Sequence, residues 1–328
     1  MGIAAGILVF AALAAGAGGA KKALPPILFI AFPIHNTLGA VSPTEMLLLP
    51  TAGDTLPASS ISVYVPTGYT LDLTLPVGTK IGTLLSLPAA VSGDIVVADP
   101  AAFTTDPCAP GTHAAVWTAG LTIGGQQTVV PFFLDPTTGD EAARGAYRIT
   151  FCQTSTLFFD LEAGLTSPST PGVYSWRAFV TPPTVTGTPP DPNSVYELRS
   201  IVALPHVLKI KATYIAKSQT LVMSGKVTAA TAPEADTQVL VSKQVGTKIA
   251  TFGSTSSKAD GSFSLRKRVR ETSKPQTLHL TAVADAPSRP CTDPPLAPAG
   301  CLLQIPAPSD EVNLTVRVPK LKPKPKKH

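Results

Sequence analysis

Four cysteines are the residues whose type and number promise the most definite chemistry: Cys108, Cys152, Cys291 and Cys301. An even number of cysteines in an exported chain predicts disulfides. Three pairings are possible for four cysteines, and the short spacings favour Cys108–Cys152 and Cys291–Cys301. A structural zinc site is the alternative, but the chain contains no Cys-x-x-Cys. We therefore predict two disulfides and no metal site.

Aromatic side chains are the next candidates, because an aromatic ring is a large surface with a polar edge on which a ligand can stack. Trp117 and Trp176 are the only tryptophans, and both fall inside predicted strands. Tyr64 and Tyr69 stand on either side of a Pro-Thr-Gly turn. If exposed, these four residues would form a ligand-contact surface suited to a sugar. If buried, they would be core residues, and the sequence leaves both alternatives open.

Motifs for catalysis are missing from the sequence. It has no Gly-x-Ser-x-Gly, no His-Glu-x-x-His and no glycine-rich nucleotide loop. Asp135, Asp140 and Glu141 place oxygen ligands on one loop and would suit calcium, but their spacing matches no calcium loop. A hydrolytic site would require His35 or His113 to meet an Asp and a Ser in the folded chain. We predict no catalytic residue and no cofactor.

The formal net charge of +5 comes from the C-terminal end of the chain. Without five lysines of this end, 21 basic residues face 21 acidic ones among the 328 residues. Nucleic-acid binding requires a concentrated basic face, so we predict no nucleic-acid partner. The tail could contact an anionic surface, and a solvated end is the alternative. Its lysines are Lys320, Lys322, Lys324, Lys326 and Lys327.

The first twenty residues predict export. Residues 3–17 carry no charge, and Gly18, Gly19 and Ala20 precede Lys21 as small residues precede a signal-peptidase site. The apolar run is shorter than the 20 or so residues that span a bilayer. No basic residue precedes it, which leaves an uncleaved anchor or an internal helix as alternatives. We predict a signal peptide over 1–20 and a secreted or cell-surface protein.

Residues 21–204 predict an all-β domain, a β-sandwich or an open barrel. Residues 60–65 alternate between apolar and polar side chains, and Leu71, Leu73 and Leu75 share one face, which is the period of a half-buried strand. The chain holds 34 prolines and 25 glycines, which favour frequent turns over long helices. The proline-rich passage 181–192 is interpreted as a stiff loop within this domain. Further strands are predicted over 95–98, 115–123, 128–134, 147–152, 156–162 and 173–180.

Residues 205–318 predict a second domain with seven strands, and residues 319–328 a basic disordered tail. Alternating apolar residues mark each strand, and Asp260-Gly261 supplies a tight turn. Seven short strands in about 110 residues are typical of an immunoglobulin-like sandwich. The strands are predicted over 207–215, 220–228, 237–245, 248–256, 262–267, 276–285 and 311–318.

Three short motifs carry a resemblance to a known family. They are the Met-Ser-Gly-Lys-Val-Thr run that begins at Met223, the Thr-Gln-Val-Leu-Val run that begins at Thr237, and Lys-Ala-Asp-Gly-Ser-Phe-Ser-Leu from Lys258. Residues 207–318 resemble bacterial Ig-like and carboxypeptidase-regulatory-like domains. The resemblance implies a structural or adhesive module of exported proteins, and it carries no catalytic residue across.

These observations lead to two hypotheses. The first is a non-enzymatic exported structural or adhesive protein built from β-sandwich modules, with the cell wall, a polysaccharide or another surface protein as its partner. The alternative is a carbohydrate-binding or accessory module of a secreted hydrolase, in which Trp117, Trp176, Tyr64 and Tyr69 would contact the sugar.

Overall fold

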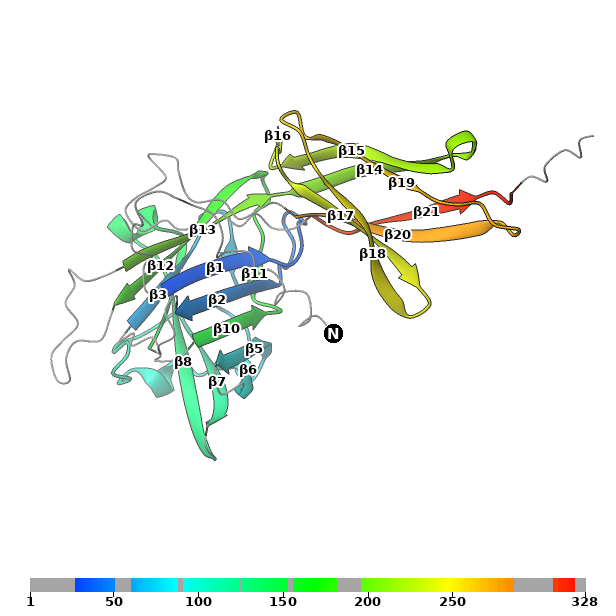
Figure 1. The fold of residues 1–328 in the computed structure, drawn as a ribbon. Coiled ribbons are helices and arrows are strands. Elements are labelled where there is room, and N and C mark those ends of the chain that lie inside the picture. Colours follow the sequence, from blue (N-terminus) through cyan, green and yellow to red (C-terminus); the bar gives the residue numbers. More distant parts are fainter. Residues whose placement is uncertain are drawn as a thin grey trace, which may run out of the picture.

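The protein consists of two β-structured units joined end to end in the computed structural model (Figure 1). The structure describes residues 27–50, 60–87, 91–123, 125–152, 156–181, 196–285 and 309–321. We call residues 27–204 the sheet unit and residues 206–321 the sandwich unit. The prediction of an all-β protein is confirmed, since the described helical segments are short 3-10 turns. Among the described residues, no helix is long and apolar enough to cross a membrane. The predicted signal peptide lies outside the described residues.

The sheet unit is built on one antiparallel sheet of eleven strands, in the order β1-β2-β10-β5-β6-β7-β8-β9-β3-β12-β13. Its strands are β1 (Ile27–Pro33), β2 (Thr44–Pro50), β3 (Ser60–Val65), β5 (Lys80–Leu87), β6 (Val91–Ala98), β7 (Ala115–Ile123), β8 (Gln126–Pro136), β9 (Tyr147–Phe151), β10 (Thr156–Leu161), β12 (Gly172–Thr181) and β13 (Tyr196–Leu204). The short strands β4 (Thr70–Leu71) and β11 (Leu165–Thr166) pair with each other.

This sheet curls until its first and last strands lie side by side. The Ser200 hydroxyl of β13 accepts a hydrogen bond from the Ala31 N–H of β1 at 3.0 Å and donates one to the Ala31 carbonyl at 2.9 Å. A side chain thus satisfies both backbone groups of an edge residue, as a neighbouring strand otherwise would.

The inward residues of the curled sheet form one continuous core. In β3, Ile61, Val63 and Val65 point inward, as their alternation predicts. Phe132, Phe151 and other rings fill the centre, with centroids 5.1–5.3 Å apart. A cavity of about 10 Å³ remains among these side chains, room for about one water molecule at most. The interior is therefore packed and holds no ligand-sized space there.

The sandwich unit has two sheets that face each other. Its strands are β14 (His206–Ile215), β15 (Thr220–Ala229), β16 (Ala232–Pro233), β17 (Gln238–Val245), β18 (Lys248–Ser256), β19 (Ser262–Arg268), β20 (Gln276–Asp285) and β21 (Val312–Val318). One sheet contains β14, β15, β16 and β19, and the other has the order β18-β17-β20-β21. All seven predicted strands agree with the observed ones within one residue. This distribution of strands is that of an Ig-like sandwich.

Two glycines explain part of the motif resemblance. A Cβ on Gly225 would lie 1.8 Å from the Lys209 carbonyl oxygen, so only glycine lets β14 and β15 approach closely there. Gly261 has a φ of +74°, which makes the predicted Asp260-Gly261 turn possible. The glycines of both motifs are therefore required by backbone geometry.

Candidate functional site

The four aromatic residues predicted to contact a ligand lie in the core of the sheet unit. Trp117 of β7 and Trp176 of β12 are 2% and 0% exposed, and Tyr64 and Tyr69 are equally buried. Tyr69 packs edge-on against Trp176, with ring centroids 5.2 Å apart. A sugar therefore has no access to these rings, and the interpretation of them as a ligand-contact surface is wrong. The sequence correctly placed Trp117, Trp176 and Tyr64 on strands, whereas Tyr69 lies between β3 and β4. Both tryptophans point into the core, and Tyr64 is buried on the opposite face of β3, beneath Arg144.

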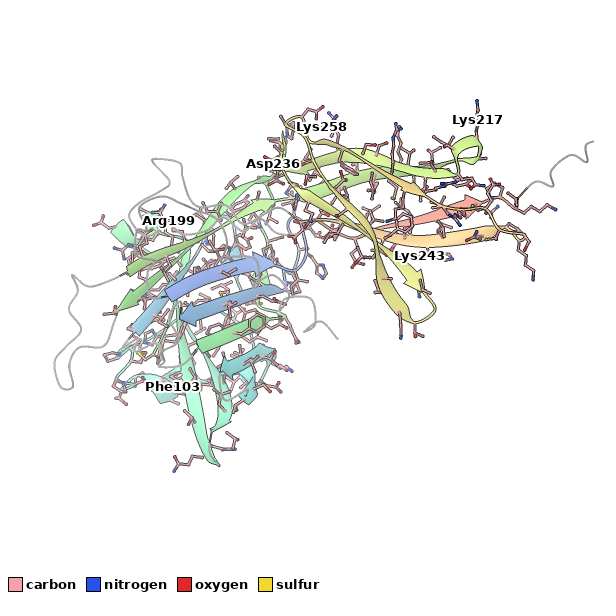
Figure 2. The ribbon with its side chains drawn as sticks, viewed as in Figure 1. Phe103, Arg199, Lys217, Asp236, Lys243 and Lys258 are labelled. Carbon is pink, nitrogen blue, oxygen red and sulfur yellow. A yellow bond between two sulfur atoms is a disulfide. The ribbon has the colours of Figure 1, made fainter. Side chains whose placement is uncertain are left out.

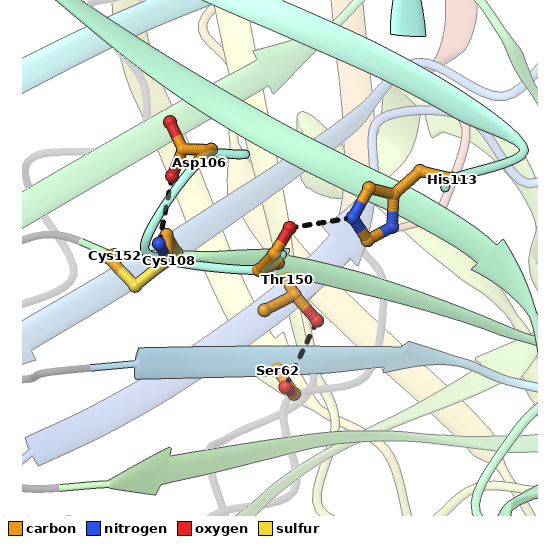
Figure 3. The surroundings of a disulfide bond; sticks show 7 residues. Ser62, Asp106, Cys108, His113, Thr150 and Cys152 are labelled. Atoms are coloured by element: carbon orange, nitrogen blue, oxygen red, sulfur yellow. Dashed lines mark hydrogen bonds between the residues drawn. A yellow bond between two sulfur atoms is a disulfide. The ribbon is translucent and has the colours of Figure 1, made fainter. Parts of the chain in front are cut away.

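The disulfide Cys108–Cys152 is present as predicted (Figure 3). It ties the loop before β7 to the end of β9, across a sequence separation of 44 residues. The Cys108 N–H donates to Asp106 Oδ1 at 2.9 Å, which fixes the loop locally. The Cys291–Cys301 pair lies outside the described residues and stays a prediction.

His113 belongs to a charged network beside this disulfide. Its Nδ1 lies 2.9 Å from Asp135 Oδ2, and its Nε2 lies 2.9 Å from the Ala109 carbonyl. A histidine that acts as a general base needs one ring nitrogen free to face the nucleophile. Both nitrogens of His113 are engaged, so this pair holds the loop in place. The condition for a hydrolytic site at His113 is not met.

Arg148 joins the carboxylates that the sequence suggested for calcium. Its guanidinium lies 3.3 Å from Asp135 and 2.9 Å from Glu141. Tyr64 also donates its hydroxyl to Glu141 at 3.1 Å. The guanidinium of Arg148 supplies the positive charge that a metal ion would otherwise bring to these carboxylates. Among the described residues no group of three or more His, Cys, Asp or Glu side chains could hold a metal ion.

A row of acidic residues crosses four strands on the outer face of the sheet unit. Glu45, Asp160, Thr83 and Asp94 are directly in register across β2, β10, β5 and β6. Burial and the neighbouring charge of Asp160 raise the pKa of Glu45 to about 7. Burial also raises the pKa of Asp160. Lys80 lies 2.8 Å from Asp94 at the end of the row. Sequence reasoning missed this row because it depends on the strand order.

The junction between the two units is a second polar site that the sequence did not reveal. Pro205 alone separates β13 from β14. The His206 N–H donates to Asn36 Oδ1 of the sheet unit at 3.1 Å, and the Asn36 N–H donates to Asp310 Oδ1 at 3.4 Å. The buried His206 ring places Nε2 2.9 Å from Glu234 Oε2. Side chains from both units therefore clamp the first residue of the sandwich unit.

The outer face of the β14-β15-β19 sheet carries five exposed basic side chains. Lys209 and Lys226 stand directly opposite each other on β14 and β15, and both are exposed. Lys211, Arg266 and Arg268 point to the same face and are also exposed. We call these five residues the cationic face. Of the predicted tail lysines, Lys320 is exposed, and the others lie outside the described residues.

The fold defines the class of protein, an all-β protein with an Ig-like sandwich. No family model matches the chain, and no curated protein sequence matches it. A tetra-tandem repeat in the extending region of a large adhesion protein is 13% identical over 88% of this chain and 74% of that one, with a TM-score of 0.23. The D0-D1 domain of intimin is 11% identical over 87% of this chain and 96% of that one, with a TM-score of 0.20. Escherichia coli alpha-2-macroglobulin activated by porcine elastase is 11% identical over 86% and 44%, also with a TM-score of 0.20. These TM-scores are too low to define a shared fold.

Proposed function

We propose that this chain is an exported structural protein with an adhesive role and that it is not an enzyme. The observation that carries the proposal is the junction, where Asn36, His206 and Asp310 bind the two units end to end through one buried and one partly buried hydrogen bond. A one-residue connection with buried contacts suits a protein that holds one unit at a fixed position relative to the other. The disulfide supports the export part, because such bonds persist in oxidising compartments.

The buried aromatic residues weigh against a carbohydrate-binding accessory module. Such a module needs exposed rings, and Trp117 and Trp176 are fully packed in the core. The network around His113 supports a non-enzymatic reading in the same way, because its contacts occupy both ring nitrogens. The contacts of His113 hold the loop before β7 in place.

Surface labelling of intact host cells tests the proposal. A membrane-impermeant amine reagent should label the full chain on intact cells and leave a cytoplasmic reference protein unlabelled. Thiol alkylation should modify Cys108 and Cys152 only after reduction. Deletion of the gene should weaken attachment of the cells to a surface, and the wild-type gene should restore it. Labelling only after lysis would contradict export, and unchanged attachment of the deletion strain would contradict the adhesive role.

A further inference from the structure

Without the five tail lysines the sequence is neutral in total, and this total hides a separation of charge between the two units. Residues 21–204 contain seven basic and thirteen acidic residues, a net charge of −6. Residues 205–318 contain fourteen basic and eight acidic residues, a net charge of +6. The two net charges cancel in a count that leaves out the tail lysines. The sandwich unit therefore carries a positive field that the sequence total concealed.

Strand register concentrates much of this charge on one face of the sandwich unit. Side chains alternate along a strand, so Lys209 and Lys211 of β14 share the outer face with Lys226 of β15. On β19, Arg266 and Arg268 lie opposite Val222 and Thr220 of β15. Their side chains therefore point to the same outer face. Six residues along β14 and three strands across give a surface about 20 Å long and about 10 Å wide. Lys217 and Lys258 stand in the turns at the two ends of this sheet (Figure 2).

The other sheet of the sandwich provides an internal comparison. Its outer face carries Thr277, His279 and Thr281 on β20, with Asn313, Thr315 and Arg317 beside them on β21. Arg317 is the one Lys or Arg in these two outward rows. The outward rows of β20 and β21 thus carry far fewer basic residues than those of β14, β15 and β19, so the cationic face is not a general property of every strand of this basic unit.

The cationic face has one neighbouring counter-charge, Asp260 beside Lys226, and otherwise no ion pair among the described residues. The ion pairs among the described residues lie elsewhere, and none includes a member of this face. Asp260, in the turn before β19, is the neighbouring carboxylate: hydrogen bonds from Ser262 lower its pKa first, and the charge of Lys226 adds to this. Like charges directly opposite each other in a sheet destabilise it. The Lys209–Lys226 pair therefore costs stability, which an anionic ligand would recover.

We propose that the cationic face binds a linear anionic polysaccharide that lies along the strands. Lysines two residues apart repeat at about 7 Å along a strand, a spacing suited to the repeated charged groups of such a polymer. Hydroxyls stand between the cations, from Thr213, Ser224 and Ser264, and can pair with sugar hydroxyls or charged oxygens. This inference deepens the proposed adhesive function by naming the partner of the sandwich unit.

The composition of the face distinguishes this partner from two others. Single-stranded nucleic acids bind through aromatic rings on which bases stack, and the described face presents no aromatic ring. Anionic membranes bind surfaces that combine cations with large apolar side chains that enter the lipid. Here Val222 is half-buried, and only Ile215 at one end of the face is a large, exposed apolar residue.

Binding of the full chain to dextran sulfate, with uncharged dextran as the matched polymer, tests the inference. We expect binding to dextran sulfate alone, with an affinity that falls steeply as salt rises. The variant K209Q/K211Q/K226Q/R266Q should bind on the order of a hundredfold more weakly and show a shallower salt dependence. The control variant K243Q/K248Q/K274Q/R317Q removes the same charge elsewhere on the unit and should keep most of the affinity. Thermal unfolding should show that both variants fold.

Several results would overturn the inference. They are failure of the wild-type chain to bind, equal loss in both variants, and tighter binding at equal salt to phosphatidylglycerol vesicles or to a DNA duplex. Each of these leaves the proposed function standing, provided that surface labelling and the attachment assay succeed. Conversely, strong polymer binding by a protein that is labelled only after lysis would contradict the proposed function and leave the binding surface intact.

Discussion

The two units stabilise themselves in different ways. The sheet unit holds the described disulfide, both tryptophans and the charged network in which Arg148 joins Asp135 to Glu141. The sandwich unit has a core of aliphatic residues with Phe263, while most of its charges point to solvent without an ion-pair partner among the described residues. In the sheet unit the charged side chains named above pair with each other inside the fold. In the sandwich unit most charged side chains remain available to contact a partner.

Removal of the disulfide should have the largest effect and should affect one unit only. We expect the C108A/C152A variant to lose about 4 kcal/mol of unfolding free energy in the sheet unit, because the bond closes a loop of 44 residues. Urea unfolding followed by tryptophan fluorescence measures this, since Trp117 and Trp176 both report on the sheet unit. Circular dichroism monitors the unfolding of the sandwich unit. An equal loss of unfolding free energy in that unit would contradict the expectation that only the sheet unit is affected.

A cavity in the core of the sandwich unit should destabilise that unit and leave the sheet unit nearly unchanged. Leu280 is 2% exposed on β20, and L280A should cost about 3 kcal/mol through lost packing and the cavity that remains. The loss should appear in the circular-dichroism transition of the sandwich unit and leave the fluorescence transition nearly unchanged. V245A, at an exposed position near a hairpin tip, is the control and should change stability by less than about 0.5 kcal/mol. Parallel loss in both transitions would show that the units unfold together.

The junction decides how far the two units remain independent. N36A removes the side chain that accepts the buried His206 N–H and should cost about 2 kcal/mol. Differential scanning calorimetry should show the two unfolding transitions moving apart as their coupling weakens. N313A removes an exposed asparagine of β21 as a control and should leave the separation unchanged. If both variants behave alike, the junction does not couple the units.

The acidic row should produce the smallest effect, and one that depends on pH. The folded-state pKa of Glu45, at about 7, lies above its ordinary value of 4.5, so the folded protein holds this proton more tightly. The contribution of Glu45 to wild-type stability should therefore fall as pH rises from about 4.5 to 7. E45Q should match the wild type at pH 4 and exceed it by about 1 kcal/mol at pH 8, a value reduced for the partial exposure of the side chain. Urea midpoints across this range measure the difference, and a constant offset would contradict the prediction.

Local patterns predicted the sandwich unit well and the sheet unit less completely. Alternation placed seven of the eight strands of the sandwich unit within one residue and missed the two-residue β16, because most of the longer strands have one buried and one exposed face. The same alternation found strands in the sheet unit but gave no indication that β1 and β13 would meet. That meeting depends on the order of eleven strands, which local periodicity does not encode.

The candidate sites show the same limit. The Cys108–Cys152 bond followed from spacing, but the burial of Trp117 depends on which face of its strand the sheet encloses. The cationic face was missed because Lys209 and Lys226 become neighbours only through strand register. The pair of His206 with Glu234 required the packing of a turn against the start of β14.

The single residue between the two units has a consequence for any surface to which the protein attaches. Because β13 ends at Leu204 and β14 begins at His206, the cationic face and the acidic row have little freedom to swivel about each other. In an attached molecule the sheet unit would consequently have one preferred orientation relative to the surface. A population of such molecules would form an oriented layer, in which the positively charged sandwich units contact the surface and the negatively charged sheet units face away from it.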